Sequence, residues 1–222
     1  MIHLKNKRKV LISIICIIIL LVIIILNFFY KNNYKVAEFG NTSIKSAKSI
    51  EEYILNISSY EADISLEVRS NKNTNKYRLK QQYESSNVFK QEVLEPENIQ
   101  GLITIYDGKN LKIENTKLGL NQIYENYQYV SENSLCLYNF IEDYKKSDTS
   151  KYEENEDNIV MQVKLEQSEN KYCVYKKLYI DKNTAKPIKM EIEDINQKVL
   201  VYILYNEIKI NSINKGEILA LK

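Results

Sequence analysis

A run of apolar residues near the N-terminus decides how the chain is divided. It covers residues 10–26, is interrupted only by Ser13, and continues into three aromatic residues at 28–30. With a rise of about 1.5 Å per residue, a helix of about 20 residues matches a hydrocarbon core that is about 30 Å thick. We therefore expect residues 10–30 to form one membrane-spanning anchor.

The charges around this run predict its orientation. Four cations come before it and two follow it closely, namely Lys5, Lys7, Arg8 and Lys9 before, and Lys31 and Lys35 after. Lys and Arg are enriched on the cytoplasmic side of spanning helices. Residues 1–9 are thus expected to be a basic cytoplasmic tail, and the C-terminal part of the chain is expected to be extracytoplasmic.

Two processed forms of the N-terminus stay open as alternatives. A cleaved secretory signal ends in small residues at its cleavage site, whereas residues 27–31 read Asn-Phe-Phe-Tyr-Lys. Lipidation of Cys16 in a bacterial lipobox needs a small residue immediately before the cysteine, and that position holds Ile15. The residues favour an uncleaved anchor over both forms.

The rest of the chain is expected to hold one domain. Residues 31–43 are mostly polar and predict a short stalk, and residues 44–222 are enough for one domain with its own core. The six cations beside the anchor exceed the net charge of +2, so the domain itself is mildly acidic. No basic stripe could follow a phosphate backbone, and nucleic-acid binding is not expected.

Alternation of apolar and polar residues predicts that most of this domain is β-strand. In residues 60–68, the apolar side chains of Ala62, Ile64, Leu66 and Val68 alternate with polar neighbours, as in a half-buried strand. Further strands are expected at 77–83, 88–94, 102–106, 111–114, 159–166, 172–181, 188–194 and 199–210. Most connections are too short for the crossovers of a parallel sheet, so we expect antiparallel pairing.

Two helices are expected between these strands. Residues 44–57 have apolar side chains at steps of three and four, with a start near Ser43 or at the Ser49–Glu52 capping-box spacing. Residues 135–144 repeat this pattern, with a cap near Ser131. The order of elements predicts an α+β domain whose helices lie against one face of a curved antiparallel sheet. The acidic segment 148–158 is expected to be a solvated loop.

Few residues in the domain could support catalysis. The only histidine, His3, precedes the anchor, so the domain has no imidazole for a nucleophilic pair or a usual zinc hydrolase. Cys136 and Cys173 have no CxxC spacing, and either a disulfide between them or two buried thiols is compatible with the sequence. No glycine-rich phosphate loop occurs. We expect no catalytic residue, no metal and no cofactor.

Paired carboxylates are the remaining catalytic candidates, because two of them can hydrolyse a glycan. Glu191, Glu193 and Asp194 lie close together near the end of a predicted strand. Glu191 and Glu193 alternate with Met190 and Ile192, which is typical of a solvated strand face. The eighteen tyrosines could stack on a sugar, but half-buried positions in a sheet account for them better.

Two motifs carry a resemblance to a known family. Residues 105–111, Ile-Tyr-Asp-Gly-Lys-Asn-Leu, are similar to the "YDG" hairpin of LolA/LolB-type proteins, and residues 178–189 resemble their recurrent strand, "IDxxTxxP" turn and strand. Residues 49–66 also look like the opening of that family. The resemblance implies a half-open antiparallel barrel with helices in its concave face, as in RseB-type sensors.

Within this superfamily the chain most resembles the GerS-type germination lipoproteins. Its Lys-, Asn-, Ile- and Tyr-rich composition suits a spore-forming Gram-positive bacterium. The resemblance implies a non-enzymatic binding protein that supports a spore-cortex N-acetylmuramoyl-L-alanine amidase, with the domain outside the cytoplasm or in the intermembrane space of the developing spore. The partner-binding residues are not identified by any motif. A lipid or lipoprotein carrier that uses the barrel mouth, and an RseB-like envelope sensor, are the alternatives.

Overall fold

The computed structural model describes residues 46–85, 87–127, 135–165 and 170–219. The expected cytoplasmic tail, the anchor at 10–30 and the stalk at 31–43 lie outside these ranges. Within them, no helix combines the length and the apolar character that crossing a bilayer requires.

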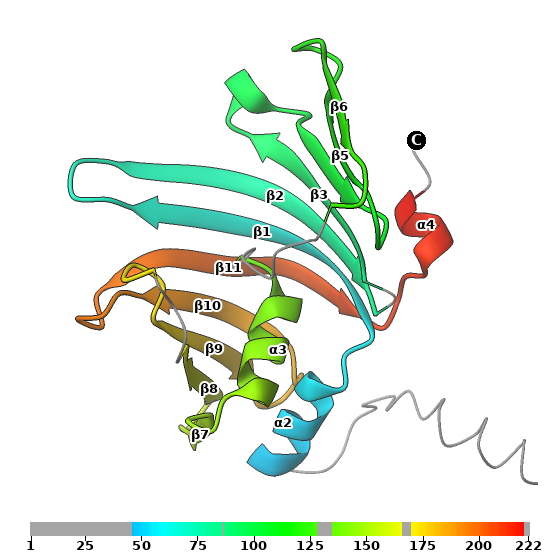
Figure 1. Ribbon diagram of the computed structural model, residues 1–222. Helices are drawn as coiled ribbons and strands as arrows, with labels where there is room; N and C mark the ends of the chain where they lie inside the picture. Colours follow the sequence, from blue (N-terminus) through cyan, green and yellow to red (C-terminus); the bar gives the residue numbers. More distant parts are fainter. Residues whose placement is uncertain (1–45, 86, 128–134, 166–169, 220–222) are drawn as a thin grey trace, which may run out of the picture. The chain divides into compact units, whose positions relative to one another are not determined.

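One antiparallel sheet of eleven strands forms the framework of the domain (Figure 1). The strands follow the order β6-β5-β4-β3-β2-β1-β11-β10-β9-β8-β7, so β6 and β7 are the two edges of an open sheet. Their bounds are β1 Ser59–Arg69, β2 Thr74–Glu84, β3 Val88–Glu95, β4 Ile103–Tyr106, β5 Leu111–Asn115, β6 Leu120–Tyr124, β7 Lys151–Glu154, β8 Asn158–Lys164, β9 Tyr175–Asp181, β10 Pro187–Glu193 and β11 Val199–Ile210.

Pairing of the first strand with the last joins the two halves of the sheet. β1 lies antiparallel to β11, with Tyr60 opposite Ile210 and Val68 opposite Val201. Every other strand pairs with its neighbour in sequence across a short connection, apart from β6 and β7, which α3 separates in the chain. The nine predicted strands and their antiparallel pairing are therefore confirmed.

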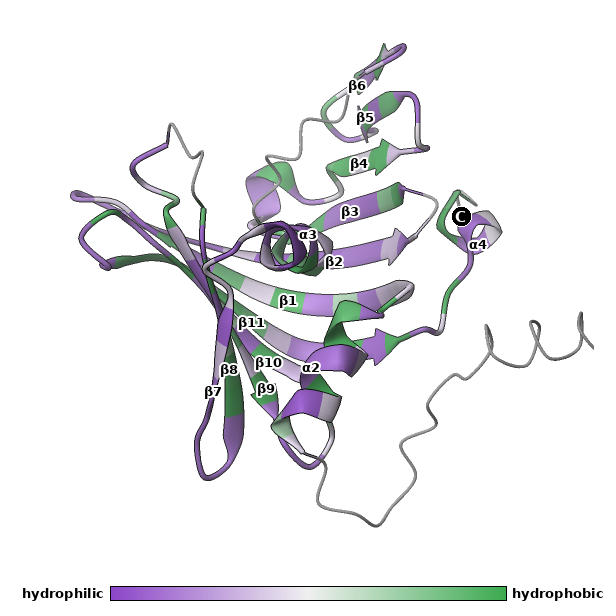
Figure 2. Cartoon of the chain, turned by 60° about the horizontal axis from the view of Figure 1, so that its bottom comes forward, coloured by the Kyte–Doolittle hydropathy of each residue, from purple (hydrophilic) through white to green (hydrophobic). Residues whose placement is uncertain are grey.

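Two helices lie in the hollow of the curved sheet (Figure 2). They are α2 (Ala47–Leu55) and α3 (Leu137–Lys146), and their buried faces join the inward side chains of the strands in one core. The sheet contributes alternate residues because successive side chains point to opposite faces of a strand. The largest fully buried apolar and aromatic side chains of this core include Ile50, Ile54, Tyr60, Ile64, Leu137, Phe140, Ile159, Met161, Leu178, Ile180 and Met190.

The two helices begin at caps that differ from the predicted ones. The Oγ of Ser46 accepts a hydrogen bond from the Ser49 N–H, so α2 starts between the two predicted positions. For α3 the N-cap is Cys136, whose side chain makes no capping bond. The predicted cap near Ser131, which lies outside the described residues, is therefore wrong.

A buried ion pair connects α3 to the sheet. Lys176 on the inward face of β9 is almost completely buried, and its Nζ lies 2.6 Å from Oδ2 of Asp143 on α3. An ammonium group can be buried only when a partner compensates the lost hydration. This pair therefore constrains how α3 lies on the sheet.

Four short elements were not predicted. β6 comes after β5 in the chain and pairs with it. β7 forms within the acidic segment at 148–158, but all four of its residues are exposed, as expected for that segment. The others are a single 3₁₀ turn (Glu97–Ile99) and α4 (Lys215–Leu219), which contacts β2 and β3. The start of α4 has a sequence signal, because Asn214 and Glu217 exchange the two side-chain hydrogen bonds of a capping box.

The two family-like motifs form tight turns held by aspartates. Oδ1 of Asp107 accepts hydrogen bonds from the backbone N–H groups of Lys109 and Asn110. Oδ1 of Asp181 accepts from both the N–H and the hydroxyl of Thr184, 2.6 and 2.7 Å away. Short Asp side chains close turns in this way, so these motif residues have a structural explanation.

Candidate functional site

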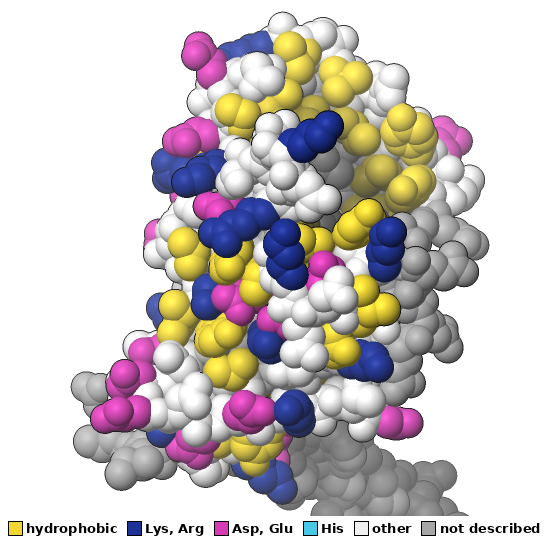
Figure 3. Space-filling view, turned by 90° about the vertical axis from the view of Figure 1, so that its left-hand side faces the viewer, with side chains coloured by type: hydrophobic (Ala, Val, Ile, Leu, Met, Phe, Trp, Pro, Cys, Tyr) yellow, Lys and Arg dark blue, Asp and Glu magenta, His cyan; other side chains and the backbone are white. Residues whose placement is uncertain are grey.

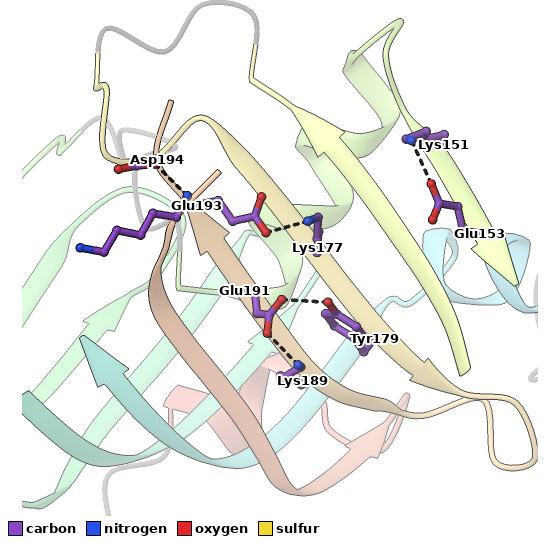
Figure 4. Close-up of polar contacts among 9 residues, drawn as sticks. Lys151, Glu153, Lys177, Tyr179, Lys189, Glu191, Glu193 and Asp194 are labelled. Carbon is purple, nitrogen blue, oxygen red and sulfur yellow. Dashed lines mark hydrogen bonds and ion pairs between the residues drawn. The ribbon is translucent and has the colours of Figure 1, made fainter. Parts of the chain in front are cut away.

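The carboxylates on β10 are buried, contrary to the solvated face that their spacing predicts. Glu191 is 7% exposed and Glu193 is 3% exposed. They lie on the sheet face opposite the helices, between residues of the flanking strands β9 and β11 (Figure 4). Alternation in one strand cannot show this burial, because it says nothing of the side chains that reach the carboxylates from the neighbouring strand β9.

Each of these carboxylates has its own lysine. Oε1 of Glu193 lies 2.7 Å from Nζ of Lys177, and Oε1 of Glu191 lies 2.7 Å from Nζ of Lys189. The hydroxyl of Tyr179 donates to Oε2 of Glu191 at 2.8 Å. The network therefore links β9 to β10 by cross-strand pairs, which stabilise a sheet.

Tyr179 has a second role in this network. Its ring lies beneath the Lys189 ammonium, with Nζ 4.0 Å from the ring centroid. Burial and the neighbouring Glu191 carboxylate raise the pKa of the Tyr179 hydroxyl, so it remains a proton donor to that carboxylate. The cation is thus bound both by the carboxylate and by the face of the ring.

Asp194 has a structural role in the next turn. Its Oδ1 accepts the backbone N–H groups of Asn196 and Lys198, at 2.8 and 2.9 Å. The three carboxylates are thus close in sequence but are engaged separately. Glycoside hydrolysis needs one carboxyl group that donates a proton and another that faces the same substrate. Each glutamate is instead held by its own lysine, and this geometry supports a structural role.

Neither cysteine belongs to a disulfide or to a metal site in the described part of the chain. Cys136 and Cys173 do not form a disulfide with each other. Cys136 is buried, and burial raises the pKa of its thiol well above the ordinary value, so it remains a protonated and poor nucleophile. In the described ranges, no three His, Cys, Asp or Glu side chains come together as a metal site. His3 lies outside those ranges.

Tyrosines contribute mainly to the core and its rim. The buried side chains of Tyr60, Tyr83, Tyr144 and Tyr205 belong to the core cluster. The rings of Tyr83 on β2 and Tyr138 on α3 stack with centroids 4.3 Å apart. The predicted half-buried sheet positions are occupied by Tyr77, Tyr175, Tyr179 and Tyr202. The tyrosines that are exposed instead are Tyr124, Tyr127, Tyr152 and Tyr172.

The surface seen at the turn end of the sheet mixes both signs of charge with apolar side chains (Figure 3). Much of the charge on the outer face of β1 and β2 is paired, as in the contact of Arg78 with Asp63 at 2.8 Å. The side chain of Asn206 also donates to Asp63. This part of the molecule presents paired charges and no continuous basic stripe.

The Asp63 pair leads to a pH-dependent prediction. The hydrogen bond from Arg78 holds the pKa of Asp63 below its usual value of 3.8. The unfolded chain therefore binds more protons than the folded one near that pH, and the pair's contribution to stability is lost as the pH falls. We expect Asp63→Asn to reduce this acid-dependent loss by less than about 1 kcal/mol, because the pair is partly exposed. Urea unfolding at pH 6 and at pH 3 checks this, and equal pH dependence in both proteins would contradict it.

Taken together, these features define a class of protein: an open, curved antiparallel sheet with helices in its hollow, whose polar clusters hold strands and turns together. The chain belongs to the family of YdcC-like sporulation proteins, because the model of that family matches residues 7–217. A search of curated proteins gives no match.

Comparison with solved structures gives several matches at low sequence identity. An uncharacterized conserved protein from Thermus thermophilus is 13% identical, with a TM-score of 0.51 over 80% of this chain and 95% of that chain. A chain in the structure of the CwlD amidase from Clostridioides difficile in complex with the GerS lipoprotein is 23% identical, with a TM-score of 0.47 over 77% and 96% of the two chains. A LolA superfamily protein from Nitrosomonas europaea is 11% identical, with a TM-score of 0.41 over 79% and 98%.

Proposed function

We propose that this protein is a non-enzymatic, membrane-anchored binding protein of sporulation and germination that supports a spore-cortex N-acetylmuramoyl-L-alanine amidase. The observation that carries the proposal is the family membership, which covers nearly the whole chain and assigns it to sporulation. The amidase enters through the sequence resemblance to GerS-type lipoproteins, at the YDG and IDxxTxxP motifs. In the solved complex it is GerS that is bound to the CwlD amidase.

The chemistry of the domain supports a binding role. Glu191 and Glu193 are each paired with a lysine, and Asp194 is engaged in a turn. The single histidine precedes the domain. A protein of this composition acts on peptidoglycan through a partner that supplies the catalytic groups.

The proposal includes a location. The apolar run at residues 10–30 anchors the chain in a membrane, with the basic residues 1–9 in the cytoplasm. The domain is then extracytoplasmic, on the side where peptidoglycan is found. A protease added to intact cells should cleave the domain and leave the N-terminal tail protected.

The amidase partnership can be tested with the full chain in detergent micelles. The full chain serves as bait in extracts of sporulating cells. Captured hydrolases are identified and then assayed on cortex peptidoglycan. We expect a cortex amidase to be captured and its rate to rise when purified full chain is added. The chain alone should release no product.

A matched variant separates support from catalysis. The double substitution Glu191→Gln and Glu193→Gln keeps the size of both side chains and removes both carboxylates. We expect the variant to stimulate the amidase as well as the parent does, provided that circular dichroism shows the same fold. Loss of the stimulated hydrolysis of cortex peptidoglycan in a folded variant would contradict a non-enzymatic role. Bound lipid without any captured amidase would favour the carrier alternative.

A further inference from the structure

The two edges of the sheet differ in their chemistry. β7, at one edge, consists of Lys151, Tyr152, Glu153 and Glu154, and all four residues are exposed. β6, at the other edge, reads Leu-Asn-Gln-Ile-Tyr over residues 120–124 and carries no charge. Charged side chains on an edge strand discourage pairing with another chain, and β6 has none of them. In the described part of the chain, no strand pairs with its outer side.

Exposed apolar side chains gather on this β6 edge. Of the large hydrophobic residues that the described structure leaves exposed, four lie here: Leu118 (57%), Ile123 (61%), Tyr124 (44%) and Tyr127 (37%). The rings of Tyr124 and Tyr127 lie 6.2 Å apart. An uncharged edge with apolar side chains and unsatisfied main-chain groups is suited to receive another strand.

Charges at the two ends of the strand indicate which strand fits. Lys117 lies in the turn before β6, and Glu125 comes directly after the last residue of β6. Neither side chain forms an ion pair with another described residue. Lys117 donates a hydrogen bond to the neutral amide oxygen of Gln100. An antiparallel copy of the same strand reverses this order. It brings Glu125 of one copy toward Lys117 of the other at both ends of the contact.

We propose that β6 pairs antiparallel with β6 of a second copy of this chain, about a two-fold axis at Gln122. This register pairs all five residues of the strand and places Leu120 opposite Tyr124 of the second copy. A self-complementary patch of this kind is what an isologous dimer requires. The sheet then continues from one protomer into the next.

Cross-linking tests the register directly. A cysteine at the axis faces its own copy, so we expect full-length Gln122→Cys to form a covalent dimer with a short bis-maleimide. Tyr152→Cys on the β7 edge is the matched control, and the parent protein accounts for the native cysteines. The proposal is overturned if Gln122→Cys yields no more dimer than these two proteins. It is also overturned if cross-linking in membranes captures a different protein in place of the second copy.

Charge exchange tests the complementarity. Glu125→Lys places like charges against Lys117 of the second copy, and we expect the dimer dissociation constant to rise about tenfold. Adding Lys117→Glu restores opposite charges and should return the constant toward that of the parent. Light scattering of the full chain in detergent gives the mass of each variant. A parent that is monomeric at all concentrations, or a double variant no tighter than Glu125→Lys, would contradict the proposal.

Discussion

Replacing Phe140 by Ala is expected to lower the free energy of unfolding by about 3–5 kcal/mol. Phe140 lies on the buried face of α3, is fully inaccessible to solvent and packs at 5.8 Å from the ring of Tyr144. Removing the ring loses its apolar burial and leaves a cavity between the helix and the sheet. Urea unfolding followed by circular dichroism measures the change.

The same helix offers a control for this substitution. Lys145→Ala changes an exposed residue at the end of α3, and its effect is expected to stay within about 0.5 kcal/mol. If Phe140→Ala lowered the free energy of unfolding no more than Lys145→Ala does, α3 would not pack on the sheet as described.

Replacing Asp143 by Ala is the second substitution with a large expected effect, a loss of about 3 kcal/mol. It leaves the buried ammonium of Lys176 without the carboxylate that lies 2.6 Å away. Adding Lys176→Met should recover most of the loss, because an apolar side chain of similar length needs no partner. Thermal unfolding of the parent, the single variant and the double variant gives the comparison.

The neighbouring residue provides the control for the ion pair. Glu142 lies 3.8 and 3.6 Å from Lys145 and Lys146 at the exposed side of α3. Such surface pairs contribute about 0–1 kcal/mol, so Glu142→Ala should change stability little. Equal effects of Glu142→Ala and Asp143→Ala would show that burial of Lys176 does not depend on its partner.

The strands were predictable because their signal is local. In β1, the buried residues Ala62, Ile64 and Leu66 follow the alternation that the sequence shows. Period-two alternation arises from the geometry of one strand with one buried face, and it does not depend on which strand lies beside it. β6 and β7 escaped prediction because edge strands with little burial lack this alternation.

The candidate site was only partly predictable. Sequence indicated that Glu191, Glu193 and Asp194 lie close together, and it indicated the motif turns at residues 107–108 and 181–184. It gave the wrong environment for the two glutamates, because Lys177 and Tyr179 reach them from β9. The contact between α3 and the buried lysine of β9 had no signal at all, since the two residues that form it are far apart in the chain.

The sequence alone indicates a long apolar segment, a domain of alternating strands, two amphipathic helices and two aspartate-closed turns. Each of these features depends on residues that are only a few positions apart in the chain. The pairing of β1 with β11, the place of both helices in the hollow of the sheet and the burial of charged groups of β9 and β10 became visible only in the folded molecule. The reason is physical: burial and ion pairing depend on which distant segments meet, and pattern within one segment carries no information about its neighbours in space.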